Sequence, residues 1–337
     1  MTSLALPVVE PSQTAEARRR AVALAARLDF SESDAGRLAI VVTEAATNLV
    51  KHAGGGEVLL RALPPAEGTG IEMLALDRGP GIRNAQDSLR DGYSTSGSPG
   101  TGLGAIARLS TRFDIYSVVG VGTAVLAQIV PKPPPPGQRS IEIGAVCVSK
   151  PGEEVSGDEW GAVTRPDGAV VAVADGLGHG VGAADASAAA MAAFRLEPEI
   201  PPGEVVARVH AALRSTRGAV IAVAAIDVRH DVVRYAGLGN ISGGIIAGGA
   251  ARHLVSNTGT AGLGARKIGE FTYPWCRQAI LVLHSDGLGT HWSLDRYPGL
   301  VRRHPSLIAG VLYRDFSRRR DDATVVVARE AEGGPRP

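Results

Sequence analysis

Two segments near the N-terminus carry apolar residues at helical spacing, TAEARRRAVALAARL and then SESDAGRLAIVVTEAATNLVKHA. Because side chains three and four positions apart share one face of a helix, this pattern predicts two amphipathic helices. Short apolar or alternating runs follow, EVLLRAL, IEMLALD, DIYSVV and TAVLAQIV. These runs predict strands that come after the two helices, with a glycine-rich loop from Gly92 to Gly104 between them, and together they indicate an α/β sandwich.

The second half of the chain is dominated by short strand-like segments, IEIGAVCVS, GAVVAVAD, AVIAVAAID, VVRYAGLG, QAILVLHSD and ATVVVAR. Two helical runs, AADASAAAMAAFRL and GEVVARVHAALRS, separate some of them. Runs of strands with inserted helices favour layered packing in which two sheets are covered by helices. The fold class predicted for the whole chain is α+β.

A proline-rich stretch, PKPPPPGQ at residues 131–138, divides the two patterns. Consecutive prolines exclude helix and central strand and favour a stiff polyproline II spacer. We therefore predict one domain over residues 1–130, a linker over 131–138, a second domain over 139–331 and a disordered tail over 332–337.

The charge, the apolar segments and the cysteines of the chain limit which partners and compartments we expect. With 35 Lys and Arg against 34 Asp and Glu, the net charge of +1 gives no global footprint for nucleic acid or anionic lipid. The first residues lack a basic segment followed by an apolar core, and no stretch approaches the length that spans a bilayer. Cys147 and Cys276 lie far apart without CxxC spacing, which fits a reducing compartment. We expect a cytoplasmic protein that binds neither nucleic acid nor membrane.

Three polar residues recur at spacings of four in EAATNLVKH, namely Glu44, Asn48 and His52, and such spacing places them on nearly one face of the predicted helix. A solvated helix face is the simplest interpretation of this stripe alone. Asp77 then follows a predicted strand in DRGPGI, beside Gly79 and Gly81. This segment alone fits an ordinary turn, but it can also present an acceptor carboxylate where a ligand approaches the backbone.

A glycine triplet, Gly100, Gly102 and Gly104 in GTGLG, opens the predicted helix AIARLS. The free N–H groups and the positive dipole end of a helix N-terminus favour phosphate. In this order, EAATNLVKH, DRGPGI and GTGLG resemble the Bergerat (GHKL) nucleotide-binding fold of gyrase, Hsp90, histidine kinases and anti-sigma serine kinases. Over residues 15 to 130 the resemblance is greatest to the RsbT-like switch kinases of bacterial partner-switching modules.

That resemblance implies an ATP site with Mg²⁺. Asn48 would hold Mg²⁺ at the phosphates, Glu44 would act as general base or orienting carboxylate, and Asp77 would bind the adenine amino group. Gly79 and Gly81 would admit the purine. The three glycines of the triplet would wrap the phosphates, and Lys51 and His52 would lie at the surface or rim.

Four acidic clusters fall at turns or at the ends of predicted strands in the second domain. They contain Asp158 in SGD, Asp175 in ADGLGHG, Asp286 in HSDGL, and Asp321 with Asp322 in DDAT. Each alone is ordinary turn chemistry. If the strand ends converge, the carboxylates repel one another and stay ionised only beside hard divalent cations. Paired Mg²⁺ or Mn²⁺ in such a site can bind a phosphate ester and activate water for attack on phosphorus.

The four clusters, in this order, resemble the metal-dependent serine/threonine phosphatases (PPM), in particular the SpoIIE and RsbX group, across residues 140 to 330. The resemblance implies an α/β/β/α sandwich in which Asp158, Asp175, Asp286 and Asp321 supply carboxylates to two Mg²⁺ or Mn²⁺ ions, together with the backbone carbonyl of Gly176. Asp322 matches a variable position. His179 could serve as an acid or a ligand but is more typical of a structural residue, Gly239 and Asn240 fit a family turn, and no Arg or Lys stands out as a clamp for the substrate phosphate.

Together the two resemblances imply a bifunctional regulator of a bacterial stress-response or sigma-factor pathway. It would phosphorylate and dephosphorylate Ser or Thr on a STAS-domain antagonist or scaffold protein. Two alternatives stay open at this stage. The first domain could be an ATP sensor without catalysis beside an active phosphatase, or it could be an anti-sigma factor that directly captures a sigma subunit. A sigma-factor regulator is a further candidate partner.

Overall fold

The computed structural model describes residues 2–64, 68–84, 102–133, 140–265 and 267–331. Contacts between Cα atoms divide the chain into two compact units. The N-terminal unit contains Ser3–Pro134 and also Tyr297–Arg314, and the C-terminal unit contains Pro135–Arg296 and Asp315–Pro337. Most of the predicted linker and the whole predicted tail lie outside the described residues.

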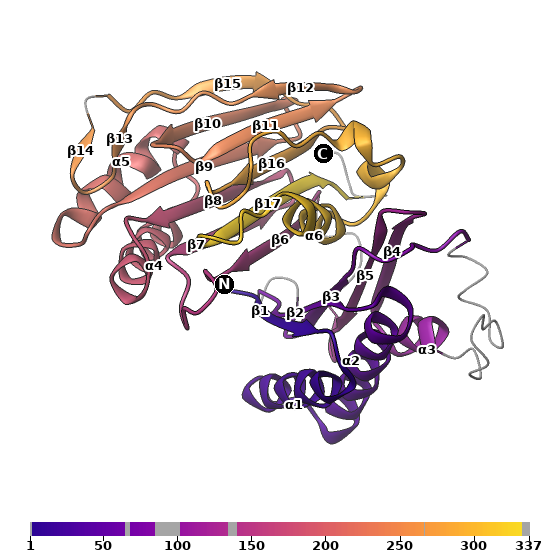
Figure 1. The fold of residues 1–337 in the computed structure, drawn as a ribbon. Coiled ribbons are helices and arrows are strands. Elements are labelled where there is room, and N and C mark those ends of the chain that lie inside the picture. The colour runs from indigo at the N-terminus through magenta and orange to yellow at the C-terminus, as the bar shows by residue number, and fades with distance from the viewer. Residues whose placement is uncertain (1, 65–67, 85–101, 134–139, 266, 332–337) are drawn as a thin grey trace. The chain divides into compact units, whose positions relative to one another are not determined.

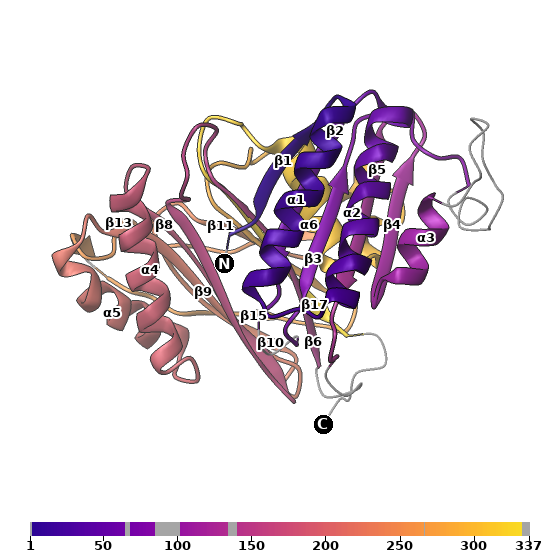
Figure 2. The same ribbon diagram turned by 90° about the horizontal axis from the view of Figure 1, so that it is seen from below.

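The N-terminal unit is built on one antiparallel sheet with strand order β1-β2-β3-β5-β4 (Figures 1 and 2). Its elements in chain order are β1 (Leu4–Val8), α1 (Pro11–Arg27), α2 (Glu32–Ala53), β2 (Gly56–Ala62), β3 (Ile71–Leu76), α3 (Gly102–Leu109), β4 (Arg112–Val118), β5 (Gly122–Ile129) and most of α6 (Pro305–Phe316). The prediction that two helices precede the first strand was wrong, because β1 comes before α1. This edge strand is short and contains Pro7, which an edge tolerates and which hides the strand in the sequence.

Helices α1 and α2 lie side by side over one face of this sheet (Figure 2). Helix α2 begins where the Ser31 hydroxyl accepts the N–H of Asp34 at 3.1 Å, and it ends at Gly54, whose φ of 72° suits a left-handed cap. Its apolar stripe is buried against the sheet, through Leu38, Val41, Val42, Ala45, Ala46 and Leu49. The polar residues of α2 are thereby left on the face away from that core.

Helix α6 packs with the same sheet although its sequence lies far along the chain. In β3 the alternate residues Ile71, Met73 and Ala75 join the core under α1 and α2. Gly310 of α6 instead approaches Leu74 and Leu76, since a Cβ at Gly310 would lie 3.4 and 3.1 Å from their side chains. Successive strand residues point to opposite faces, so α6 covers the face opposite α1 and α2. This explains why every residue of β3 is buried.

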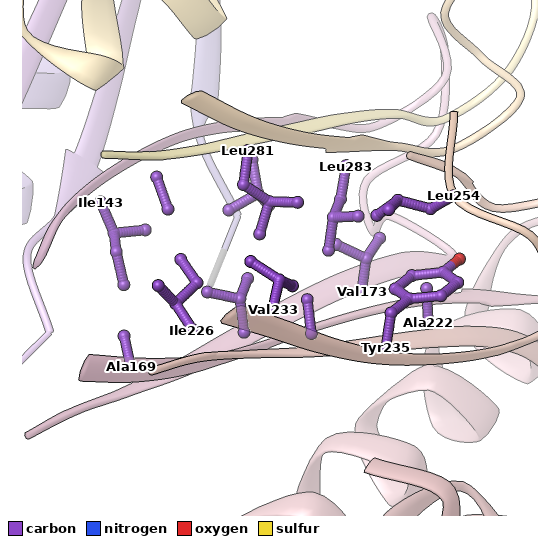
Figure 3. Close-up of a cluster of buried hydrophobic side chains, with 14 of the residues drawn as sticks. Ile143, Ala169, Val173, Ala222, Ile226, Val233, Tyr235, Leu254, Leu281 and Leu283 are labelled. Atoms are coloured by element: carbon purple, nitrogen blue, oxygen red, sulfur yellow. The ribbon is translucent and has the colours of Figure 1, made fainter. Parts of the chain in front are cut away.

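The C-terminal unit contains two five-stranded antiparallel sheets, ordered β15-β10-β9-β8-β7 and β12-β11-β16-β17-β6. Its strands are β6 (Ile141–Val148), β7 (Asp158–Arg165), β8 (Gly168–Gly176), β9 (Ala219–Asp227), β10 (Val232–Leu238), β11 (Ser242–Ala247), β12 (Ala250–His253), β13 (Gly259–Thr260), β14 (Gly264–Ala265), β15 (Phe271–Pro274), β16 (Ile280–His284) and β17 (Ala323–Glu330). Figure 3 shows the core between the two sheets, where Ile143, Leu281 and Leu283 face Val173, Ala222, Ile226 and Val233.

Helices α4 (Val181–Leu196) and α5 (Pro202–Ala212) cover the outer face of the sheet that contains β8 and β9. Phe194 and Met191 of α4 and Val206 of α5 are fully buried there against the small apolar residues of the strands. The alternating residues of β8 and β9 therefore serve two cores, one between the sheets and one under the helices. The α+β fold class is confirmed, with a sheet covered by helices in the N-terminal unit and two stacked sheets covered by helices in the C-terminal unit. Among the described residues, no helix is both long and apolar enough to cross a bilayer.

Candidate active sites

In the N-terminal unit, Glu44 and Asn48 lie one turn apart on α2, and both are half-buried. A Cβ placed on Gly102, the first residue of α3, would lie 3.2 Å from Asn48 Oδ1 and 3.4 Å from Glu44 Oε2. The structure therefore brings Gly102 of the glycine triplet beside two residues of the helix motif. Lys51 and His52 are exposed.

Asp77 follows β3 and is half-buried. Its Oδ1 accepts the backbone N–H groups of Gly79 at 2.8 Å and of Thr123 at 3.0 Å. Burial raises the pKa of Asp77, against the lowering by these two hydrogen bonds. Both bonds use one oxygen, and no described residue donates to Oδ2, so the carboxylate is held in place with an acceptor left for a ligand.

The glycines beside Asp77 pack against neighbouring backbone. A Cβ on Gly79 would lie 2.7 Å from Ala53 Cα at the end of α2. Gly81 has a φ of 71°, and a Cβ there would lie 2.2 Å from the carbonyl oxygen of Val118. These contacts require glycine for packing and fix the loop to α2 and β4. The role of both glycines in admitting a purine stays a prediction.

Of the glycine triplet, Gly100 lies outside the described residues, whereas Gly102 and Gly104 lie in the first turn of α3. The first N–H groups of a helix have no partner within the helix, so α3 presents donors beside Asn48 and Glu44. The amide oxygen of Asn48 is a hard ligand and the Glu44 carboxylate is a proton acceptor. The donor set fits a Mg²⁺-bound triphosphate at this position.

In the C-terminal unit, three of the predicted metal ligands line one cavity of about 550 Å³. Asp175 lies at the end of β8, Asp286 follows β16, and Asp321 precedes β17. The strand ends converge as the sequence predicted. We call this space the acidic cavity, and its other lining residues are Lys150, Leu177, Gly178, His179, Val220, Gly239, Asn240, Thr258 and Gly259.

Asp158 and Gly176 are not among the residues that line the acidic cavity. Asp158 is only 2% exposed, and its Oδ2 accepts the hydroxyl of Ser285 at 2.6 Å. Gly176 lies in close contact with Ala183, since a Cβ there would be 2.1 Å from the Ala183 carbonyl oxygen. The ligand roles of Asp158 and Gly176 stay predictions. Asp158 lies beside two predicted ligands, because it pairs with Asp175 and accepts a hydrogen bond from Ser285, the residue before Asp286.

Burial raises the pKa of Asp158 to about 7, against the hydrogen bond from Ser285. Burial likewise raises the pKa of Asp175 to about 9, and repulsion from Asp158, Asp286 and Asp321 adds to the rise. Close carboxylates in a desolvated site cannot all stay ionised without compensating positive charge. The acidic cavity therefore lacks positive charge to balance its carboxylates, and divalent cations would supply that charge.

The residues fit a hard divalent metal in donor chemistry, because every candidate side chain offers carboxylate oxygen. Among the described residues, no three His, Cys, Asp or Glu side chains lie close enough together to hold an ion as they stand. A hard divalent ion commonly keeps several water ligands, so one or two carboxylates of the cavity can hold it.

The carboxylate of Asp322 is held by backbone N–H groups. This fits the resemblance, in which Asp322 matches a variable position and not a metal ligand. Its Oδ1 accepts the N–H of Lys150 and its Oδ2 accepts the N–H of Gly157, both at 2.8 Å. Burial raises the pKa of Asp322, against the effect of these two bonds. Asp322 thus fastens a loop rather than facing the acidic cavity.

Three residues of this site could not be assigned a role from the sequence. The Asn240 side-chain amide donates to Asp286 Oδ2 at 2.9 Å and orients a predicted ligand. His179 lines the acidic cavity, with Nδ1 2.8 Å from Glu153 Oε1. Lys150 lines it as well. Asn240 follows a glycine and Lys150 precedes a proline, as in many ordinary turns, so the sequence around them does not indicate a functional role.

Comparisons with known proteins agree with this geometry. Residues 8–129 match the family model described as histidine kinase-like ATPase domain, and residues 165–330 match the model of stage II sporulation protein E (SpoIIE). The serine/threonine-protein kinase RsbT of Bacillus subtilis is 35% identical over 104 residues, which are 31% of this chain and 78% of RsbT.

Two solved structures share the fold. One, described as the bacterial stressosome, a modular system adapted to control secondary messenger signalling, is 26% identical with a TM-score of 0.53, over 56% of this chain and 99% of that chain. The RsbU and RsbW domains of a Mycobacterium tuberculosis protein align at 18% identity with a TM-score of 0.50, over 60% of this chain and 62% of theirs. The chain belongs to the family of RsbT-like kinases with a histidine kinase-like ATPase domain, joined in one polypeptide to a SpoIIE domain of the metal-dependent phosphatase fold.

Proposed function

We propose that this protein is a cytoplasmic bifunctional regulator of a partner-switching pathway. Its N-terminal unit transfers phosphate from ATP to Ser or Thr of a STAS-domain partner, and its C-terminal unit removes that phosphate. The observation that carries the proposal is the convergence of motifs distant in sequence at two sites. Gly102 meets Glu44 and Asn48 at one, and Asp175, Asp286 and Asp321 line the acidic cavity at the other.

At the first site, bound Mg²⁺ would neutralise the charge of the transferred phosphate group. Asp77 accepts a hydrogen bond from the exocyclic amine of adenine through its free oxygen. The N-terminus of α3 donates backbone N–H groups to phosphate oxygens. Glu44 accepts the proton of the attacking hydroxyl, a role that suits a carboxylate beside Asn48 and the phosphates.

At the second site, a pair of divalent ions would supply positive charge and an activated water molecule. Asp175, Asp286 and Asp321 hold that charge in the acidic cavity, and Asn240 orients Asp286 through its 2.9 Å hydrogen bond. The buried Asp158, which pairs with Asp175 in the sheet, adds negative charge next to the cavity. The reaction that this arrangement supports is hydrolysis of a phosphomonoester.

The identity of the partner rests on the relatives rather than on the site. Similarity to RsbT and to a stressosome structure supports a protein of the same kind of pathway. RsbT-like kinases and RsbX-like phosphatases resemble one another in acting on STAS-domain proteins, which supports one shared partner for both sites. The net charge of +1 gives no support for nucleic acid or membrane as a further partner.

The test is a two-way phosphate assay with a STAS-domain protein, ATP labelled at the γ-position and Mg²⁺ or Mn²⁺. Glu44→Gln should lose phosphate transfer and keep dephosphorylation, whereas Asp175→Asn should show the opposite. Glu32→Gln on α2 and Asp185→Asn on α4 change exposed carboxylates and should behave as wild type. Transfer by Glu44→Gln at the wild-type rate would refute the kinase role, and dephosphorylation by Asp175→Asn at the wild-type rate would refute the metal site.

A further inference from the structure

We propose that the ammonium group of Lys150 binds the phosphoryl group of the substrate in the acidic cavity. This proposal rests on the phosphatase function proposed above. Lys150 is half-buried and lines the cavity together with Asp175, Asp286 and Asp321. It lies in the loop between β6 and β7, so the sequence around it gave no sign of a phosphate clamp.

The backbone of Lys150 is fixed at the edge of the cavity by Asp322. The carboxylate of Asp322 accepts the N–H of Lys150 through one oxygen and the N–H of Gly157 through the other, both at 2.8 Å. One side chain therefore holds both ends of the loop. Because Asp321 directly precedes Asp322 in the chain and lines the cavity, this anchor sets Lys150 beside the carboxylates.

Within the loop, local bonds restrict Lys150 further. Its carbonyl oxygen accepts the N–H of Glu153 at 3.0 Å, and the Ser149 hydroxyl donates to the Glu153 carbonyl at 3.1 Å. Pro151 follows and limits the backbone of the preceding residue to extended conformations. The Cα of Lys150 is thus held from several sides, and only its side chain has to move to meet a ligand. A preorganised backbone lowers the entropic cost of binding.

The charge of Lys150 is available for a ligand. No described residue forms a hydrogen bond or ion pair with its ammonium group. Among the described residues that line the acidic cavity, Lys150 and His179 are those that can carry positive charge, and His179 Nδ1 is engaged by Glu153. A phosphomonoester enters as a dianion toward a site rich in carboxylates. A lysine that reaches its oxygens as a point charge offsets that repulsion and orients the phosphorus.

The competing explanation is that Lys150 only compensates the charge of the carboxylates. The two roles make different demands. A phosphate clamp affects the binding of phosphate and phosphate esters and leaves metal binding nearly unchanged. A counter-ion affects metal binding, because its removal increases the negative charge that attracts the cations.

The experiment uses the full chain with Mn²⁺ and p-nitrophenyl phosphate, and compares Lys150→Met and Lys150→Arg with wild type. For Lys150→Met we expect KM and the inhibition constant of inorganic phosphate to rise by about 10-fold or more, as for loss of a charged hydrogen bond. The half-saturating concentration of Mn²⁺ should change by less than about 3-fold, and Lys150→Arg should recover most of the phosphate affinity. Lys132→Met, at an exposed lysine, is the matched control.

An unchanged inhibition constant for phosphate in Lys150→Met would overturn the proposal, and so would a large decrease in the half-saturating Mn²⁺ concentration as the main effect. Thermal unfolding of each variant establishes that it is folded. Calorimetric titration of Mn²⁺-loaded protein with inorganic phosphate gives the same comparison without turnover. If wild type binds phosphate through Lys150 but does not hydrolyse the ester, the proposed phosphatase function fails while the binding site stands.

Discussion

Asp158 and Asp175 are direct partners in the antiparallel register of β7 and β8. Like charges at directly opposed strand positions destabilise a sheet. Asp158 is buried and Asp175 is half-buried, and the pKa values rise to about 7 for Asp158 and about 9 for Asp175. This pair therefore lowers the stability of the folded sheet, by an amount that depends on pH and on positive charge in the acidic cavity.

The first prediction concerns pH. A carboxyl group whose pKa is higher in the folded state than in the unfolded state binds more protons when folded, so its contribution to stability is lost as pH rises. Without metal, the free energy of unfolding should fall as pH rises from the ordinary carboxyl range through about 7 and then about 9. Stabilisation by Mn²⁺ should grow over the same range, because metal competes with protons for the carboxylates.

Thermal unfolding at about pH 6 and about pH 9, with EDTA or with Mn²⁺, measures both effects. Asp175→Asn is the control, since an amide at this position removes one of the two titrating groups. The difference between wild type and this variant isolates the pair from other titrating residues. A metal-free wild type that gains stability relative to Asp175→Asn as pH rises would contradict the prediction.

The second prediction concerns Gly102. An added methyl group at this position would approach the Asn48 amide to 3.2 Å and Glu44 to 3.4 Å. We expect Gly102→Ala to weaken ATP binding by about 10-fold or more, and phosphate transfer with it, while thermal stability stays near wild type. Gly36→Ala is the matched control, because Gly36 lies in α2 with open space around it and alanine favours the helix by about 1 kcal/mol. Fluorescent ATP titration and labelled phosphate transfer compare the two, and equal ATP affinity for both variants would refute the predicted convergence.

The third prediction concerns a buried polar cluster under α6. Glu72 accepts from Arg61 at 2.6 Å, from Gln128 at 2.8 Å and from Ser306 of α6 at 2.7 Å. Burial acts to raise the pKa of Glu72, but Arg61 and the hydrogen bonds outweigh it and the pKa is lowered. Glu72→Ala would leave a buried guanidinium without its main partner, and we expect a loss of about 3–5 kcal/mol of stability.

Urea unfolding measures that loss, and Ser306→Ala should lose less, about 1–2 kcal/mol, because Glu72 keeps its other donors. Glu16→Ala removes an exposed carboxylate that pairs with Arg19 and Arg20 and should have no measurable effect. Wild-type stability in both Glu72→Ala and Ser306→Ala would show that α6 does not stabilise the N-terminal unit.

The fourth prediction concerns the start of the helix that carries Glu44 and Asn48. The Ser31 hydroxyl caps α2 by accepting the N–H of Asp34. We expect Ser31→Ala to cost about 1 kcal/mol of unfolding free energy in the N-terminal unit. Ser33→Ala, two residues on within the helix, should be neutral or slightly stabilising because alanine is the better helix former. Equal effects of the two variants in urea unfolding would count against the cap.

Much of the architecture was accessible from the sequence. Helical spacing identified α1 and α2, alternation identified most strands, and the motif order pointed to both sites before any contact was known. The short strand β1 was missed because Pro7 and five residues of length leave too weak a pattern. The packing of α6 on the N-terminal sheet was also missed, because an apolar helix between two strands does not state which sheet it covers.

By itself the sequence determined the kinds of element, the order of the motifs and the residue types able to hold nucleotide or metal. Periodicity and turn chemistry are local and can be read along the chain. Only the tertiary structure decided that Asp175, Asp286 and Asp321 line the acidic cavity while Asp158 is buried and does not line it. It alone placed Lys150 at that cavity, by means of a carboxylate 172 positions away. Such placements follow from strand register and packing between distant segments, which no local pattern encodes.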